Sequence, residues 1–167
     1  MAKITLKDHS INTIGTPPAV GTQAPAFTLV NAKLEDVTLT HYKGKQKILN
    51  IFPSLDTPTC ATSVRKFNEM AGSLPGVVVL NISADLPFAQ KRFCAAEGLE
   101  NVEVLSTFRS SFARDYQVLL TDSILAGLCS RAVLVLDVND KVIFCDQVAE
   151  LSHEPNYLSA LAALTGD

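Results

Sequence analysis

The sequence predicts an α/β protein of three layers, in which helices cover a mixed β-sheet. Short apolar runs alternate with segments whose apolar residues recur at helical spacing. This strand–helix alternation is followed by two strands that flank a turn at Asn139-Asp140, and then by a last helix. The sequence contains no repeat, linker or low-complexity tract, so we expect residues 1–167 to form one domain.

The first third of the chain is predicted to contain short strands separated by glycine and proline. The N-terminal stretch MAKITLKDHSINTIG alternates like a strand pair, with one strand at 4–6. Further strands are expected at 27–30 and 37–39. The apolar run 47–52 is typical of a buried strand, and Pro53 ends it.

A helix is predicted over 58–71, directly after this buried strand. Asp56 and Thr57 are residue types that cap helix N-termini, and Pro58 suits the first helical position. Apolar residues then recur at helical spacing, at Val64, Phe67 and Ala71. Gly72 is expected to end the helix.

The rest of the chain continues the alternation. The expected elements are a strand at 77–82, a helix opened by Asp85 and Pro87 and closed by Gly98, a strand at 102–105, a short helix at 108–116, strands at 132–136 and 142–144, and a helix at 155–164.

Composition excludes several classes of protein. Hydrophobic residues make up 47% of the chain and charged residues 19%, which is typical of a globular domain. The net charge of −3 and the lack of a Lys/Arg cluster argue against a nucleic-acid partner. No apolar stretch approaches the roughly 20 residues that span a bilayer, so we expect a soluble, cytoplasmic protein with no membrane partner.

Four cysteines are present, too few and too widely spaced for a secreted disulfide scaffold: Cys60, Cys94, Cys129 and Cys145. No pair has the close spacing of a zinc site, and the three histidines are scattered. We therefore expect no metal site and no cofactor.

Cys60 is the strongest candidate for a reactive nucleophile, because it falls in the first turn of the predicted helix 58–71. A thiol there faces unpaired backbone N–H groups and the positive end of the helix dipole. Both favour the thiolate, which is the reactive form of cysteine. The alternative is that Cys60 is inert and buried, as most cysteines are.

Four separate blocks resemble a known family in order and spacing. Pro53-x-x-x-Thr57-x-x-Cys60 matches the signature of the peroxiredoxins. The blocks NIFPSLDTPTCATSVRKFN, ISADLPFAQKRFCAAEGL, LSTFR and SRAVLVLD resemble the bacterial thiol peroxidase subfamily, the atypical two-cysteine peroxiredoxins, from about Gly21 to the C-terminus. The resemblance implies a thioredoxin-like fold: a central mixed sheet flanked by helices, here with an N-terminal β-hairpin extension.

The resemblance also implies roles for site residues. Cys60 is the peroxidatic cysteine, and Arg131 is the cation that supports its thiolate. Thr57 orients the peroxide, and Pro53 shields the thiolate from water. Each role has a simpler alternative: Thr57 as a helix cap only, Arg131 as a surface arginine and Pro53 as a strand end.

Cys94 is, by the same resemblance, the resolving cysteine that forms an intrachain disulfide with the Cys60 sulfenic acid and so prevents over-oxidation. The alternative is a helix cysteine that only packs. Because a disulfide needs Cα atoms within about 7 Å, we expect part of helix 58–71 or of helix 86–97 to unwind during the cycle. Cys129 and Cys145 lie at no helix start, so we expect both to be structural. The alternative for Cys129, which lies two residues before Arg131, is a place near the active site.

The activity implied is reduction of hydrogen peroxide and of alkyl or lipid hydroperoxides, with thioredoxin as reductant and a homodimer as the assembly. A peroxide sensor that passes its oxidation to a partner would use the same Cys60. A cysteine hydrolase is less well supported, because no histidine lies in a recognised partner block. A general disulfide oxidoreductase is disfavoured because no Cys-x-x-Cys is present.

Overall fold

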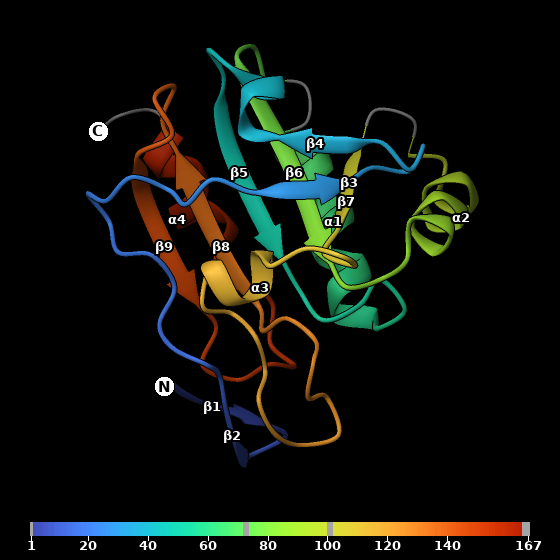
Figure 1. The fold of residues 1–167 in the computed structure, drawn as a ribbon, viewed down its shortest axis with the longest axis vertical. Helices are drawn as coiled ribbons and strands as arrows, with labels where there is room; N and C mark the ends of the chain where they lie inside the picture. The colour runs from blue at the N-terminus through green and yellow to red at the C-terminus, as the bar shows by residue number, and fades with distance from the viewer. Residues whose placement is uncertain (1, 72–73, 100–101, 165–167) are drawn as a thin grey trace.

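The computed structural model describes residues 2–71, 74–99 and 102–164. A mixed sheet of seven strands forms the centre, in the order β4-β3-β7-β6-β5-β8-β9 (Figure 1). Its strands are β3 (Thr28–Val30), β4 (Asp36–Thr38), β5 (Gln46–Ile51), β6 (Val77–Ser83), β7 (Glu103–Ser106), β8 (Ala132–Leu136) and β9 (Val142–Gln147). The three inner strands β5, β6 and β7 are parallel, and the remaining pairs are antiparallel.

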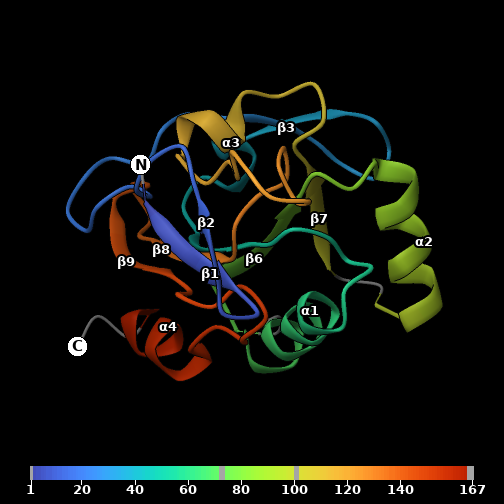
Figure 2. The same ribbon diagram turned by 90° about the horizontal axis from the view of Figure 1, so that it is seen from below.

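Helices cover both faces of this sheet. The helices are η1 (Leu39–Tyr42), α1 (Pro58–Ala71), α2 (Pro87–Glu97), α3 (Phe112–Asp115) and α4 (Tyr157–Leu164). In the view from below, α1 and α4 lie on one side of the sheet, α3 lies on the other, and α2 lies beside β7 (Figure 2). The predicted thioredoxin-like, three-layer plan is confirmed.

The core is divided by the sheet, and β5 contributes to both halves. Ile48 packs with residues of α1 and α4, including Phe67 and Ala160. Leu49 and Ile51 join the larger cluster on the opposite face, with Tyr116 of the segment after α3. A strand buried on both faces reads as a continuous apolar run, which is why 47–52 was recognisable in the sequence.

The N-terminal strand pair is confirmed as a hairpin of β1 (Lys3–Leu6) and β2 (His9–Asn12), which forms a separate two-stranded sheet. Ile4 and Ile11 pack against Leu120 and Leu151. The hairpin lies at the end of the molecule toward which the β5 arrow points, and Figure 2 looks onto it. This is the end at which α1 begins.

Helix α1 begins and ends at the predicted residues, while the expected terminator Gly72 lies outside the described residues. The short helix predicted at 108–116 is wrong at its start, because α3 begins only at Phe112. Arg109 has a φ of 54°, in the left-handed region, which cannot continue an α-helix. Likewise α4 begins at Tyr157 rather than 155, with the Asn156 carboxamide accepting the Ser159 N–H at 3.1 Å.

Smaller corrections concern strand ends and one cap. Leu39 begins the 3-10 helix η1 instead of ending a strand. The hairpin strand predicted at 142–144 extends to Gln147, around the expected turn in which Asp140 has a φ of 64°. Gly98 closes α2 in the left-handed conformation as predicted, but Leu86 rather than Asp85 is its N-cap.

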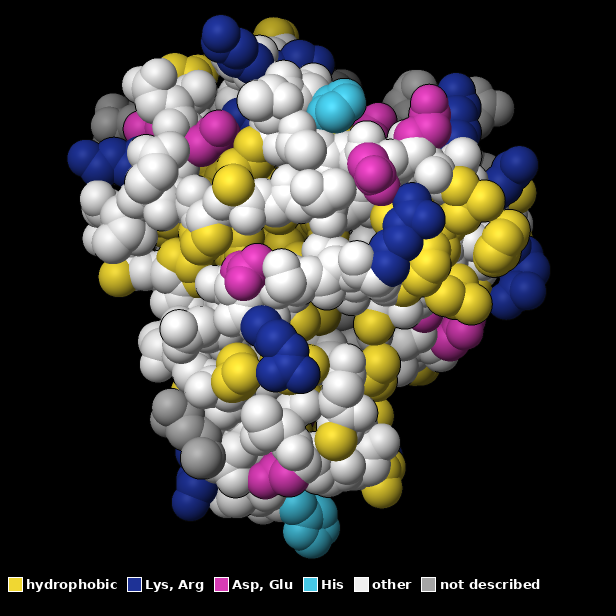
Figure 3. Space-filling view, in the orientation of Figure 1, with side chains coloured by type: hydrophobic (Ala, Val, Ile, Leu, Met, Phe, Trp, Pro, Cys, Tyr) yellow, Lys and Arg dark blue, Asp and Glu magenta, His cyan; other side chains and the backbone are white. Residues whose placement is uncertain are grey.

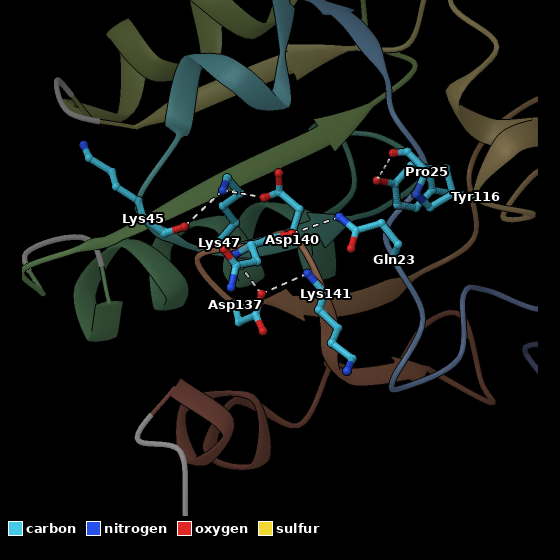
Figure 4. A network of polar contacts seen from close by, with 9 residues as sticks. Gln23, Pro25, Lys45, Lys47, Tyr116, Asp137, Asp140 and Lys141 are labelled. Carbon is cyan, nitrogen blue, oxygen red and sulfur yellow. Dashed lines mark hydrogen bonds and ion pairs between the residues drawn. The ribbon is translucent and has the colours of Figure 1, made fainter.

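A buried ion pair anchors the far end of β5. Lys47 is fully buried, and its ammonium donates to the Asp140 carboxylate at 2.5 Å and to the Lys45 carbonyl at 3.0 Å (Figure 4). A buried charge is tolerated only when it is paired and hydrogen-bonded. The pair connects β5 to the β8–β9 turn at the end opposite the first turn of α1.

Candidate active site

Cys60 is the third residue of α1 and is fully buried. It packs with Phe52, Leu55 and Val64, and the half-buried Phe93 of α2 contacts the same cluster. The sulfur therefore has no contact with bulk solvent, and its polar neighbours come from the protein.

Thr57 lies directly before α1, where its backbone and side chain both serve the helix start. Its carbonyl accepts the Ala61 N–H at 3.0 Å, and its hydroxyl accepts the Cys60 N–H at 3.4 Å. The same hydroxyl donates to the Ser54 carbonyl at 3.1 Å. Its oxygen is therefore fixed beside the first turn that carries the thiol.

Arg131 lies one residue before β8 and is only 2% exposed. Its Nη2 donates to the Cys60 sulfur at 3.3 Å, and its Nε donates to the Leu151 carbonyl at 3.0 Å. The remaining nitrogen, Nη1, is buried and has no hydrogen-bond partner in the described part of the chain. A permanently charged group thus lies beside the sulfur, and its remaining donor is available to an incoming acceptor.

A cavity of about 500 Å³ opens in front of this arrangement. Its lining is mostly apolar, and its members are Leu6, Lys7, Pro53, Ser54, Thr57, Pro58, Thr59, Leu125, Leu128, Arg131, Leu151 and Ser152. Pro53, Thr57 and Arg131, which the sequence singled out, thus meet at one cavity next to the buried Cys60. A concave apolar site with few convergent polar groups is typical of small-molecule binding.

Asp85 positions the loop that precedes α1, although the sequence indicated it only as the start of a helix. Its carboxylate accepts the Leu55 N–H at 2.8 Å and the hydroxyls of Ser54 and Ser83, each at 2.6 Å. These bonds hold the loop between β5 and α1, which carries Pro53. The signal available in the sequence was an acidic residue directly after a parallel strand that neighbours β5.

The segment 149–152 is a second support that the sequence did not indicate. Besides the Leu151 carbonyl that holds Arg131, the Ser152 carbonyl accepts the Thr59 hydroxyl of α1 at 3.0 Å. Thr5 of the hairpin pairs with this segment through backbone bonds of 2.8 Å to Ala149 and Leu151. The N-terminal hairpin therefore forms part of the site.

Cys94 lies on α2, is half-buried, and is a free thiol like Cys60. Burial raises the pKa of the Cys94 thiol above its ordinary value. The two helices that carry these cysteines are joined by an ion pair, in which the Arg65 guanidinium donates to the Glu97 carboxylate at 2.6 and 2.9 Å.

The other two cysteines are not among the described residues that line the cavity. Cys129 is fully buried in the core cluster on the α3 side of the sheet, and burial raises the pKa of its thiol to about 12. Cys145 is partly buried on β9, and burial raises the pKa of its thiol to about 11. Both thiols are held in the unreactive neutral form at neutral pH.

Neither a metal centre nor a membrane span is found among residues 2–71, 74–99 and 102–164. No three His, Cys, Asp or Glu side chains gather there closely enough to hold a metal ion. Within the same ranges no helix has both the length and the apolarity to cross a bilayer.

Comparison with known proteins agrees with this geometry. The redoxin family matches residues 19–161. The thiol peroxidases of Mycobacterium tuberculosis (strain H37Rv) and Mycobacterium bovis are each 53% identical over 164 residues, which covers 98% of this chain and 99% of each relative. The chain therefore belongs to the redoxin family. Within that family it groups with the thiol peroxidases, which confirms the resemblance found in the sequence.

Solved structures agree on the fold. A peroxiredoxin-like protein from Aquifex aeolicus has a TM-score of 0.93 at 36% identity, covering 99% of this chain and 97% of that one. A thiol peroxidase from Chromobacterium violaceum has a TM-score of 0.92 at 24% identity with the same coverage.

Proposed function

We propose that this chain is a thiol-dependent peroxidase that reduces hydrogen peroxide and organic hydroperoxides. The observation that carries the proposal is the contact between Arg131 Nη2 and the Cys60 sulfur at 3.3 Å, beside a cavity open to a small molecule. Membership of the redoxin family and 53% identity to thiol peroxidases support the same activity.

The first step follows from the atoms at the site. The Cys60 thiolate attacks one oxygen of the peroxide, the O–O bond breaks, and the other oxygen leaves with the bonding pair and takes up a proton. The products are a Cys60 sulfenic acid and an alcohol, or water from hydrogen peroxide. We propose that Arg131 Nη1, which has no hydrogen-bond partner among the described residues, and the Thr57 hydroxyl hold the peroxide oxygens in line with the sulfur.

The second step assigns Cys94 as the resolving cysteine. Its thiolate attacks the sulfenic sulfur and displaces hydroxide, which leaves as water after protonation, and a Cys60–Cys94 disulfide remains. Cys60 is fully buried on α1 while Cys94 lies on α2, so we propose that the first turn of α1 or part of α2 unwinds for the two sulfurs to meet. Comparing the backbone around both residues in reduced and oxidised protein tests this.

An external dithiol completes the cycle, and we propose a thioredoxin-type donor in the cytoplasm. Reduction proceeds by thiol–disulfide exchange through a mixed disulfide.

We further propose a homodimer. Hydrophobic side chains gather on the surface over α2 (Figure 3), where Leu86 is 51% and Phe88 67% exposed. Sedimentation of the wild type beside a Phe88→Glu variant tests that assembly.

Intact mass after one equivalent of peroxide tests the cysteine roles. The wild type should lose two hydrogens, Cys94→Ser should gain one oxygen, and Cys60→Ser should stay unchanged. Cys129→Ser is the matched control, because it should behave as the wild type. A disulfide that still forms in Cys60→Ser would overturn the assignment. Continuous peroxide consumption with thioredoxin and its reductase, rather than one stoichiometric oxidation, separates the enzyme from a peroxide sensor.

A further inference from the structure

The N-terminal hairpin brings a lysine to the mouth of the apolar cavity. Leu6 and Lys7, at the end of β1 and in the turn that follows, both line the cavity in front of Cys60. Apart from the buried Arg131, Lys7 is the only charged residue of that lining. Nothing in the peroxide chemistry described above requires it.

The turn that carries Lys7 is fixed in place. Lys7 and Asp8 have φ values of 49° and 69°, so they form a two-residue left-handed turn of the kind that matches a twisted hairpin. The Asp8 N–H and the Thr5 hydroxyl both donate to the Glu150 carboxylate, at 3.0 and 3.1 Å. The turn is thereby tied to the segment that also holds Arg131.

Lys7 has no ion-pair partner in the part of the chain that the structure describes. It is exposed, and within residues 2–71, 74–99 and 102–164 it forms no ion pair with a carboxylate. The carboxylate of Glu150 accepts hydrogen bonds from the Thr5, Asp8 and Ser152 donors and forms no ion pair with Lys7. An ammonium at the mouth of an apolar cavity attracts an anion carried by an apolar ligand.

We infer that Lys7 is a specificity-determining residue, which binds the carboxylate of a hydroperoxide whose hydrocarbon chain lies in the cavity. The chain would contact the leucines of the lining, namely Leu6, Leu125, Leu128 and Leu151. The hydroperoxide group would reach Cys60, with the carboxylate at the solvent side. The substrate class is a fatty-acid hydroperoxide in its anionic form. This inference rests on the proposed peroxidase function and adds a preference for substrates that carry a negative charge.

The test compares linoleic acid hydroperoxide with its methyl ester, which has the same chain and no charge. For Lys7→Gln we expect kcat/KM to fall about three- to fivefold with the acid, as an exposed ion pair permits, and to stay unchanged with the ester. Lys7→Arg should keep the wild-type ratio of acid to ester. Raising the salt concentration should reduce the preference for the acid in the wild type and in Lys7→Arg, but not in Lys7→Gln.

Lys3→Gln is the matched control, because Lys3 is an exposed lysine of the same hairpin that does not line the cavity. An equal loss in Lys3→Gln, or an equal loss on acid and ester in Lys7→Gln, would overturn the inference. Cumene hydroperoxide, which is neutral, separates the two proposals. If the wild type reduces neither it nor hydrogen peroxide, the peroxidase function itself is wrong, whereas turnover of it without any acid preference removes only the role of Lys7.

Discussion

Arg131 donates from Nη2 to the sulfur of Cys60 at 3.3 Å, although the two residues are 71 positions apart in the chain. The guanidinium cannot turn away from the thiol, because its Nε is bound to the Leu151 carbonyl at 3.0 Å. Its planar fork therefore fixes both a charge and a direction at the sulfur.

Replacing Arg131 with lysine should lower the second-order rate constant for peroxide reduction by ~10²-fold, the usual cost of losing one preorganised donor. Lysine keeps the charge, but its three donors sit on one nitrogen and cannot reproduce the planar fork that reaches Leu151, Cys60 and an incoming acceptor from three separate nitrogens. Stopped-flow measurement with hydrogen peroxide tests this. Arg109→Lys is the matched control, since Arg109 is an exposed arginine paired with Asp36. An unchanged rate in Arg131→Lys would show that charge alone suffices.

Glu150 should make the stability of the hairpin region depend on pH. Hydrogen bonds from Ser152, Asp8 and Thr5 lower the pKa of the Glu150 carboxyl to about 2, from an ordinary value of 4.5. Because the folded pKa is the lower one, the stabilisation is full above about pH 4.5 and is lost as the pH falls toward 2.

The melting temperature of Glu150→Gln should therefore lie below that of the wild type at pH 7, and the difference should shrink as the pH falls from 4.5 toward 2. Thermal unfolding followed by circular dichroism measures it. Glu35→Gln, which removes an exposed carboxylate from the β3–β4 turn, serves as control. A difference that stays constant down to pH 2 would contradict the assigned bonds.

Much of the local structure was predictable from the sequence, because its causes are local. Helix α1 was predicted with correct bounds, since Thr57, Pro58 and the apolar spacing all act within a few residues of one another. The start of α3 was not predicted correctly, because Arg109 adopts a left-handed conformation that an arginine in the sequence does not indicate. The position of β8 beside β5 depends on pairing between distant segments and could not be deduced from periodicity.

The residues of the site likewise divide into those that the sequence indicates and those that it does not. Cys60 and Thr57 share one short motif and could be related by spacing alone, whereas Arg131 entered only through resemblance to a family. The contributions of Leu151 and Ser152 come from backbone carbonyls, which any residue type supplies, so no sequence pattern indicates them. Lys7 lies in the N-terminal hairpin, which reaches the site only through tertiary packing, so no local sequence pattern indicates it.

The Arg65–Glu97 ion pair should slow the opening that brings Cys94 to Cys60. It joins α1 to α2 on the surface, with side-chain exposures of 45% and 31%, so solvent screens the pair and we expect its contribution to stability to be small. Glu97→Gln should accelerate disulfide formation after peroxide addition by up to about fivefold. High salt should accelerate the wild type but not the variant.

Acid quench followed by intact mass measures this rate of disulfide formation. Glu69→Gln makes the same change of charge at an exposed position, here on α1, and should leave the rate of disulfide formation unchanged. A slower rate in Glu97→Gln would mean that the ion pair guides the two helices together rather than holding them closed.

The rate of disulfide formation should also rise with pH across the neutral range. Burial raises the pKa of the Cys94 thiol above its ordinary value of 9.0, so at neutral pH this thiol is almost entirely protonated. Only the thiolate attacks the sulfenic sulfur, and its fraction grows about tenfold per pH unit below the pKa. Unwinding of α2 would bring the pKa back toward its ordinary value without removing this dependence.

Following the disulfide from pH 6 to pH 8.5 after one equivalent of peroxide tests the prediction. Cys94→Ser is the control that should form no disulfide at any pH. Cys145→Ser should reproduce the wild-type profile, because this cysteine lies on strand β9 and burial raises the pKa of its thiol to about 11. A flat profile would contradict the prediction, since it would make opening of the helices, and not ionisation of Cys94, the slow event.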